Sequence, residues 1–65
     1  MGLKLNEEYL GPLGVYVARQ DERCGMEVYI VEVTTGSVTT ELTCGFSLGK
    51  CLESLHKHLN KPEGK

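Results

Sequence analysis

Residues 13–19 alternate between two faces and are rich in β-forming residues, and residues 26–33 carry apolar residues on both faces. The first pattern predicts a β-strand, and the second predicts the middle strand of a sheet. A third stretch, 38–44, is rich in threonine and continues the pattern after a turn at Thr34-Thr35-Gly36. The polar segment 20–25 ends in glycine, and we interpret it as the loop between the first two strands.

From residue 48 the spacing of apolar residues changes to that of an α-helix. Ser47 is a suitable N-cap, and Pro62 ends the helical region. The apolar stripe of this helix consists of Leu48, Cys51, Leu52, Leu55 and Leu59. Together these patterns predict an α+β domain in which a three-stranded antiparallel sheet packs on one C-terminal helix, in the order β-β-β-α.

The segment 1–12 carries a different local signal. Asn6 suits a helix cap, two glutamates suit a first turn, and Gly11-Pro12 suit a helix end. We therefore expect a short N-terminal helical turn in residues 1–12. The whole chain, 1–65, is expected to form one domain whose last residues, 61–65, are a frayed tail.

The turn after the second strand determines which side chains share a face. A three-residue loop with Gly36 in the left-handed position pairs Val33 with Ser37. One face then collects Met26, Val28, Ile30, Val38, Thr40, Leu42 and Cys44, and the other collects Glu27, Tyr29, Val31, Thr39, Glu41 and Thr43. A two-residue loop that pairs Val33 with Val38 instead sets Glu41 on the face of Val28 and Ile30, which separates polar from apolar side chains less well. We expect the helix to cover the face of Val28, Ile30 and Leu42.

One helix covers one face of a sheet, so the second face is expected to stay open. The residues that we predict to bind a partner there are Tyr16, Glu27, Tyr29, Val31 and Glu41. Aromatic side chains with a polar rim are typical of protein-binding and homodimer surfaces, although tyrosine and valine also simply suit strands. On this prediction, changing Tyr29 and Val31 to serine weakens association and leaves the fold intact.

Charge and length narrow the classes of function. The 65 residues carry a net charge of -2, with nine Asp and Glu against seven Lys and Arg. A nucleic-acid-binding domain usually has a basic face. The alternative that stays open is an RNA- or DNA-binding domain that uses the helix side, through Lys50, Lys57, Lys61 and the two histidines.

Cysteine usage and hydropathy bear on the compartment. Residues 1–10 contain no apolar run of the kind that a secretory signal needs, and no stretch has the length of a transmembrane helix. The three cysteines are an odd number, so they cannot all form internal disulfides. We therefore expect a cytoplasmic protein with reduced thiols.

No set of residues forms a convincing catalytic or metal-binding motif. The segment 45–51 resembles a phosphate-binding loop, but it is one residue short, and Cys51 stands where serine or threonine would bind magnesium. Cys51 and His58 lie two helical turns apart, about 10 Å, which is too far to share one zinc ion. We therefore predict no catalytic residue, no metal and no cofactor.

Two family resemblances are partial. The order of turn, three strands and helix resembles the double-stranded RNA-binding domain, but the lysine cluster at the start of that family's last helix is absent. The segment 45–55 resembles the strand-to-helix junction of HicB-type antitoxins, which would imply a protein partner. The Pro-Asp-Leu-Pro-Gly stretch of that family is absent. Neither resemblance identifies residues of a site.

These observations together favour a small non-enzymatic protein-binding module, such as an inhibitor, an adaptor or an antitoxin-like regulator. It would act through the open sheet face or as a homodimer. A phage or mobile-element protein that blocks a host factor would fit this size.

Overall fold

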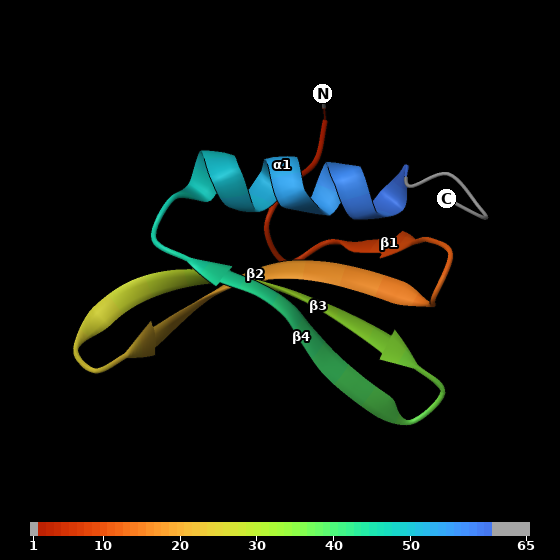
Figure 1. The fold of residues 1–65 in the computed structure, drawn as a ribbon, viewed down its shortest axis with the longest axis horizontal. Helices are drawn as coiled ribbons and strands as arrows, with labels where there is room; N and C mark the ends of the chain where they lie inside the picture. The colour runs from red at the N-terminus through yellow and green to blue at the C-terminus, as the bar shows by residue number, and fades with distance from the viewer. Residues whose placement is uncertain (1, 61–65) are drawn as a thin grey trace.

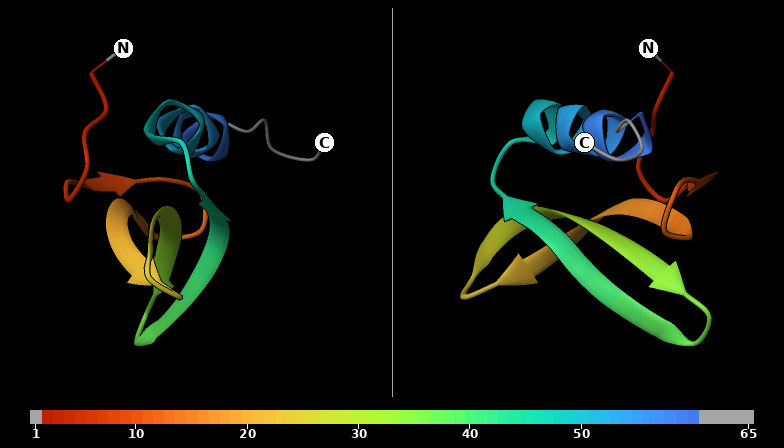
Figure 2. Two further views of the ribbon diagram at one scale, coloured as in Figure 1. Left: turned by 90° about the vertical axis from the view of Figure 1, so that its left-hand side faces the viewer. Right: turned by 45° about the vertical axis from the view of Figure 1, so that its right-hand side comes forward.

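A computed structural model describes residues 2–60 of the chain. They form a four-stranded antiparallel sheet in the order β1-β2-β3-β4, followed by one helix. The strands are β1 (Glu8–Leu10), β2 (Val15–Arg23), β3 (Met26–Thr35) and β4 (Val38–Gly45), and the helix is α1 (Leu48–Leu59). Figure 1 shows α1 lying across one face of a strongly twisted sheet, and Figure 2 shows the two layers from the side. The expected α+β class, with an antiparallel sheet packed on a C-terminal helix, is confirmed.

The expected N-terminal helical turn is wrong, because this segment forms a fourth strand. Residues 8–10 pair with residues 15–17 of β2. The Gly11 amide donates to the Gly14 carbonyl at 2.9 Å, so the chain reverses at Pro12-Leu13 and returns as β2. A Cβ at Gly11 would lie 2.6 Å from the Tyr16 ring, which explains why a residue without a side chain stands there. Gly11 and Pro12, which suited a helix end in the sequence, belong instead to the turn of the β1–β2 hairpin.

The expected loop at 20–25 is also wrong over most of its length. β2 continues to Arg23, which pairs with Met26, and only Cys24-Gly25 form the turn. Both turn residues have positive φ, +54° and +77°, as a type I′ hairpin requires. Polar residues 20–23 are therefore strand residues on an extended hairpin, which projects beyond the start of α1 (Figure 1).

The β3–β4 hairpin does not have the favoured register; it has the two-residue loop of the alternative, with Thr40 instead of Val38 opposite Val33. Thr35 pairs with Val38 around a two-residue turn, in which Gly36 has φ +64°. Leu42 has no partner on β3, since Glu41 pairs with Glu32 and Thr43 pairs with Val31. This bulge reverses the face assignment along β4. The expected placement of Thr43 and Cys44 is correct, whereas Glu41 lies on the face of Ile30, where it was not expected.

The helix covers the face opposite to the expected one. The buried core joins Cys51 and Leu55 of α1 to four residues of the two central strands, Tyr16, Ala18, Val31 and Val33. Leu3, Leu5, Tyr9, Tyr29, Leu42, Leu52 and Leu59 pack around it. The expectation that α1 covers Val28 and Ile30 is therefore wrong. The reason is that β2 pairs Arg19 with Ile30 and Asp21 with Val28, so that a helix on that face would bury charges at a high desolvation penalty.

The start of α1 agrees with the sequence. The Ser47 hydroxyl accepts a hydrogen bond from the Lys50 amide at 3.3 Å, so Ser47 is the N-cap. Asn60 is the C-cap, and the described chain ends there. The expected frayed tail at 61–65, with Lys61 and Pro62, lies outside the described residues. With 12 residues, α1 is shorter than the roughly 20 apolar residues that a membrane-spanning helix needs.

Candidate functional site

Two of the five residues predicted to bind a partner are core residues. Tyr16 is 1% exposed and Val31 is fully buried, and both pack beneath α1. The Tyr16 ring also stacks on His58, with 6.2 Å between ring centroids. The expected open strip of tyrosines and valines is therefore wrong, because the chain covers this face with its own helix. The serine substitution proposed at Val31 would consequently damage the core.

The other three predicted residues lie in three different surroundings. Tyr29 shares the face of Val31 but is only half-buried, near the end of the sheet where α1 begins. Glu27 is exposed on the same face, farther along the β2–β3 hairpin. Glu41 lies on the opposite face, where it accepts two hydrogen bonds from the Arg23 guanidinium. The structure thus keeps Tyr29 and Glu27 near one another and separates them from Glu41.

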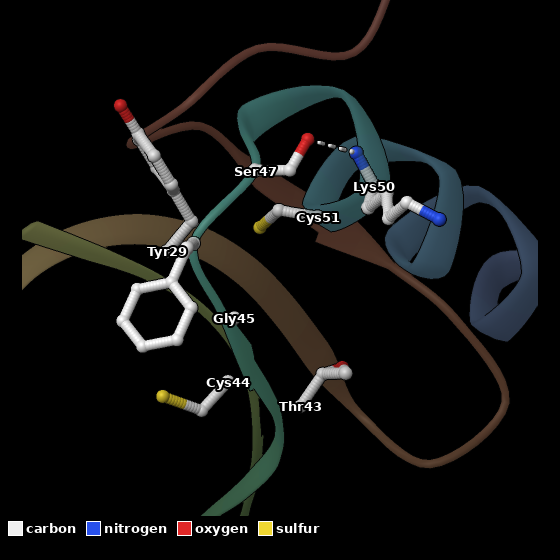
Figure 3. A pocket seen from close by; sticks show the side chains of 8 residues that line it. Tyr29, Thr43, Cys44, Gly45, Ser47, Lys50 and Cys51 are labelled. Carbon is white, nitrogen blue, oxygen red and sulfur yellow. Dashed lines mark hydrogen bonds between the residues drawn. The ribbon is translucent and has the colours of Figure 1, made fainter.

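A groove opens at the junction of β4 and α1, next to Tyr29. We call it the Phe46 groove; its volume is about 390 Å³, and it is lined by Tyr29, Thr43, Cys44, Gly45, Phe46, Ser47, Lys50 and Cys51. In Figure 3 the side chains of Cys44 and Cys51 lie on opposite sides of β4, near the end of the strand, and the Lys50 ammonium points away from Tyr29 and from both thiols. The groove therefore presents mainly carbon and sulfur, and the nearby Arg23 guanidinium is paired with Glu41 and Asp21.

The local sequence explains how this groove forms. β4 ends at Gly45, opposite Tyr29, and the absence of a side chain at Gly45 leaves the space above Tyr29 empty. Phe46 stands between the end of the strand and the Ser47 cap, so it belongs to neither packed element and is 70% exposed. Leu48, in the first turn of α1, is 41% exposed. Sequence reasoning missed Phe46, although its position outside both apolar periods was a usable signal.

An acidic pair lies beside the groove on the β2–β3 hairpin. Glu22 and Glu27 are directly opposite one another, so their exposed side chains share a face. Glu27 is two residues from Tyr29 on the same strand, or about 7 Å away. Within residues 2–60, no Lys, Arg or His nitrogen forms an ion pair with either carboxylate. A polar hollow of about 430 Å³ adjoins the pair and is lined by Asn6, Gln20, Asp21, Glu22 and Glu27.

The opposite face of the sheet uses its charges internally. Arg19 pairs with Glu32 at 3.0 Å and with Asp21 at 3.5 Å, while Arg23 pairs with Asp21 and with Glu41. Hydrogen bonding from Arg23 holds the pKa of Glu41 below its ordinary value. The Glu22 amide, which donates to Asp21 at 2.8 Å, is the main cause of a lowered pKa at Asp21. Because these charges are already partnered, this face offers little unpaired charge to a ligand.

The thiols and hydroxyl in the groove are poorly suited to catalysis. Burial raises the pKa of the Cys51 thiol, which keeps it protonated at neutral pH. The Ser47 hydroxyl is occupied as the helix cap. Cys44 is exposed, and its Sγ lies 4.0 Å from Arg23 Nη1. Across the described part of the chain, no three His, Cys, Asp or Glu side chains are placed to hold a metal ion.

The nucleic-acid alternative requires a continuous basic surface. Lys50 and Lys57 lie exposed on α1, whereas Arg19 and Arg23 lie on the other face in ion pairs. Lys61 lies outside the described residues. Of the cations considered for this alternative, Lys50 and Lys57 lie on α1 two helical turns apart, so nucleic-acid binding through the helix side stays a prediction.

Comparison with known proteins adds no further constraint on the site. The chain matches no protein-family model, no curated protein and no solved structure.

Proposed function

We propose that this chain is a small non-enzymatic protein-binding module whose partner docks in the Phe46 groove. The observation that carries the proposal is the 70% exposure of Phe46 beside an apolar groove of about 390 Å³. Large aromatic side chains are among the residues that contribute most to protein–protein binding. A groove of this volume also accepts one large apolar side chain from a partner.

The character of the groove supports docking over catalysis. Its thiol at Cys51 is held protonated by burial, and its hydroxyl at Ser47 serves as a cap. A partner that inserts an apolar side chain here would displace water from carbon and sulfur, without leaving a buried polar group unpaired. This is the chemistry of a binding site, and it fits an inhibitor or regulator that acts in the cytoplasm.

The proposal moves the binding surface from the centre of the sheet to its end. Tyr16 and Val31 are no longer part of it, because α1 covers them. Tyr29 stays at the rim of the groove, and Glu27 lies just beyond it. Glu41 belongs to the other face and is not part of the proposed site.

Affinity purification with the full chain tests the proposal. Wild-type protein is compared with Phe46→Ser and with the matched control Leu13→Ser, which removes another exposed apolar side chain, 60% exposed, in the β1–β2 turn. We expect Phe46→Ser to lose a specifically captured protein and Leu13→Ser to retain it. Equal capture by all three proteins would contradict the proposal.

A second copy of the chain is the competing partner for the same groove. Sedimentation equilibrium over a range of concentrations measures this association directly. A dimer that dissociates on Phe46→Ser would assign the groove to a homodimer. A monomer at all concentrations, together with capture of a foreign protein, would support the inhibitor or regulator role.

A further inference from the structure

We infer that the Phe46 groove selects a cationic partner segment, in which a large apolar side chain is flanked by lysine or arginine. This inference rests on the proposed function and specifies the chemistry of the partner. It comes from two neighbouring features, the apolar groove, which Tyr29 lines, and the acidic pair Glu22 and Glu27, which lies on the same sheet face as Tyr29.

The acidic pair carries charge that the fold itself does not use. Like charges directly opposite one another destabilise an antiparallel pair of strands. On the other face of the same two strands, Arg19 and Arg23 neutralise their acidic neighbours. No such cation serves Glu22 or Glu27 within the described residues. A lysine or arginine of a partner would be attracted to both carboxylates, and it would also offset the repulsion between Glu22 and Glu27. Both effects would favour binding.

The position of the pair matches that of a residue flanking a docked side chain. Tyr29 lines the groove, and Glu27 lies two residues away on the same face of β3. A partner whose aromatic or aliphatic side chain fills the groove therefore brings its neighbouring residue over the carboxylates, about 7 Å away.

The lysine that borders the groove does not oppose this selection. The Lys50 ammonium points away from Tyr29 and the thiols (Figure 3), and Arg23, whose Nη1 lies 4.0 Å from the Cys44 Sγ, is paired with Asp21 and Glu41. Charge complementarity at a rim mainly sets partner choice and association rate.

The test uses two capped pentapeptides as probes, Lys-Lys-Phe-Lys-Lys and Glu-Glu-Phe-Glu-Glu, titrated into the 15N-labelled full chain and followed by amide chemical shifts. We expect the cationic peptide to shift the amides of Glu27, Tyr29, Gly45 and Phe46. We also expect it to bind at least about fivefold more tightly than the acidic peptide, since each exposed ion pair contributes modestly. Raising sodium chloride from about 50 to 300 mM should weaken it further.

Two double variants with equal net charge separate local from global electrostatics. Glu22→Gln with Glu27→Gln should weaken the cationic peptide about fivefold. Glu8→Gln with Glu53→Gln, which removes two exposed carboxylates elsewhere, should leave its affinity unchanged. Equal loss in both variants, equal binding of the two peptides, or shifts confined to residues away from the groove would overturn the inference.

Failure of this inference is distinguishable from failure of the proposed function. Capture of a protein that is lost in Phe46→Ser but retained in the Glu22→Gln, Glu27→Gln variant would leave the groove as the binding site and remove the charge selection. Capture that is insensitive to Phe46→Ser would remove both.

Discussion

Val31 and Ile30 are adjacent on β3, and both are fully shielded from solvent, yet they point to opposite faces of the sheet. Val31 is covered by the apolar side of α1, in one cluster with Tyr16 and Leu55. Ile30 has no helix over it. It lies opposite Arg19 and Cys44, among charged side chains that pair with one another. The same degree of burial therefore has two different physical origins.

The difference shows that an arginine-rich sheet face does not need a second layer. The aliphatic stem of an arginine covers apolar surface while its guanidinium remains in water. Arg19 and Arg23 keep their heads partly exposed, with 35% and 43% of the side chain accessible. They also neutralise the glutamates that sequence reasoning expected to be unfavourable beside Ile30. A 65-residue chain can thus bury residues on both faces with one helix.

We expect the largest loss of stability from a substitution on the sheet face that α1 covers. Val31→Ser removes buried methyl groups beneath α1 and adds a hydroxyl, and should lower the free energy of unfolding by about 3 kcal/mol. Val17→Ser is the matched control, because Val17 lies on the adjacent strand but points to the open face and is half-buried. It should lower stability by less than about 1 kcal/mol. Urea unfolding measures both, and equal losses would contradict the face assignment.

We expect a smaller loss of stability from a substitution on the open face of the sheet. Ile30→Ala should lower the free energy of unfolding by about 2 kcal/mol, at the low end for such substitutions. The reason is that α1 does not pack on Ile30, so the exposed side chains of that face can move into the vacated space more easily than the packed residues beneath the helix. Urea unfolding is again the measurement. A loss larger than that of Val31→Ser would show that the open face holds the dominant core.

The smallest expected effect is the pH dependence of the stability that Glu41 contributes on the open face. The folded-state pKa of Glu41 is lowered mainly by hydrogen bonding from Arg23. A lowered pKa contributes stability that is fully present above the unfolded value, near 4.5, and is lost as pH falls through the folded value. The destabilisation caused by Glu41→Gln should therefore be present at pH 7 and smaller at an acid pH below 4.5.

Thermal unfolding at the two pH values checks this expectation. Because Glu41 is exposed, the change should be small and should also shrink at high salt. Glu53→Gln, on the helix, is the control and should show no comparable pH dependence. A Glu41→Gln effect that grows on acidification would have the wrong sign and would contradict the role of Arg23.

Local patterns predicted most elements correctly. The apolar β3, the threonine-rich β4 and the stripe from Leu48 to Leu59 all appear where expected, and Ser47 caps the helix. The helical turn predicted at Asn6–Pro12 was wrong because glycine and proline indicate a chain reversal but do not specify whether a helix or a strand precedes it. The loop predicted at residues 20–23 was wrong because all four residues are polar and give no alternation, although β2 stays paired with β3 as far as Arg23.

The site was less predictable than the fold. Tyr29 and Glu27 were correctly placed on one face, but Tyr16 and Val31 were expected to be open. That error came partly from the β3–β4 turn, because a two-residue turn at Gly36-Ser37 places Glu41 opposite Glu32, on the face of Ile30. It also came from leaving the β2–β3 pairing out of the face assignment. Phe46 was overlooked because its exposure depends on where β4 stops relative to α1.

The amino-acid sequence by itself determined the class of fold, the order of the central elements and the amphipathic helix, because these follow from periodicity and capping within short segments. Only the tertiary structure decided which sheet face the helix covers. That choice depends on the ion pairs of Arg19 and Arg23 with residues far along the chain. Burying these charges beneath a helix would carry a high desolvation penalty, so α1 packs on the other face. The Phe46 groove and its acidic neighbours follow from the same choice.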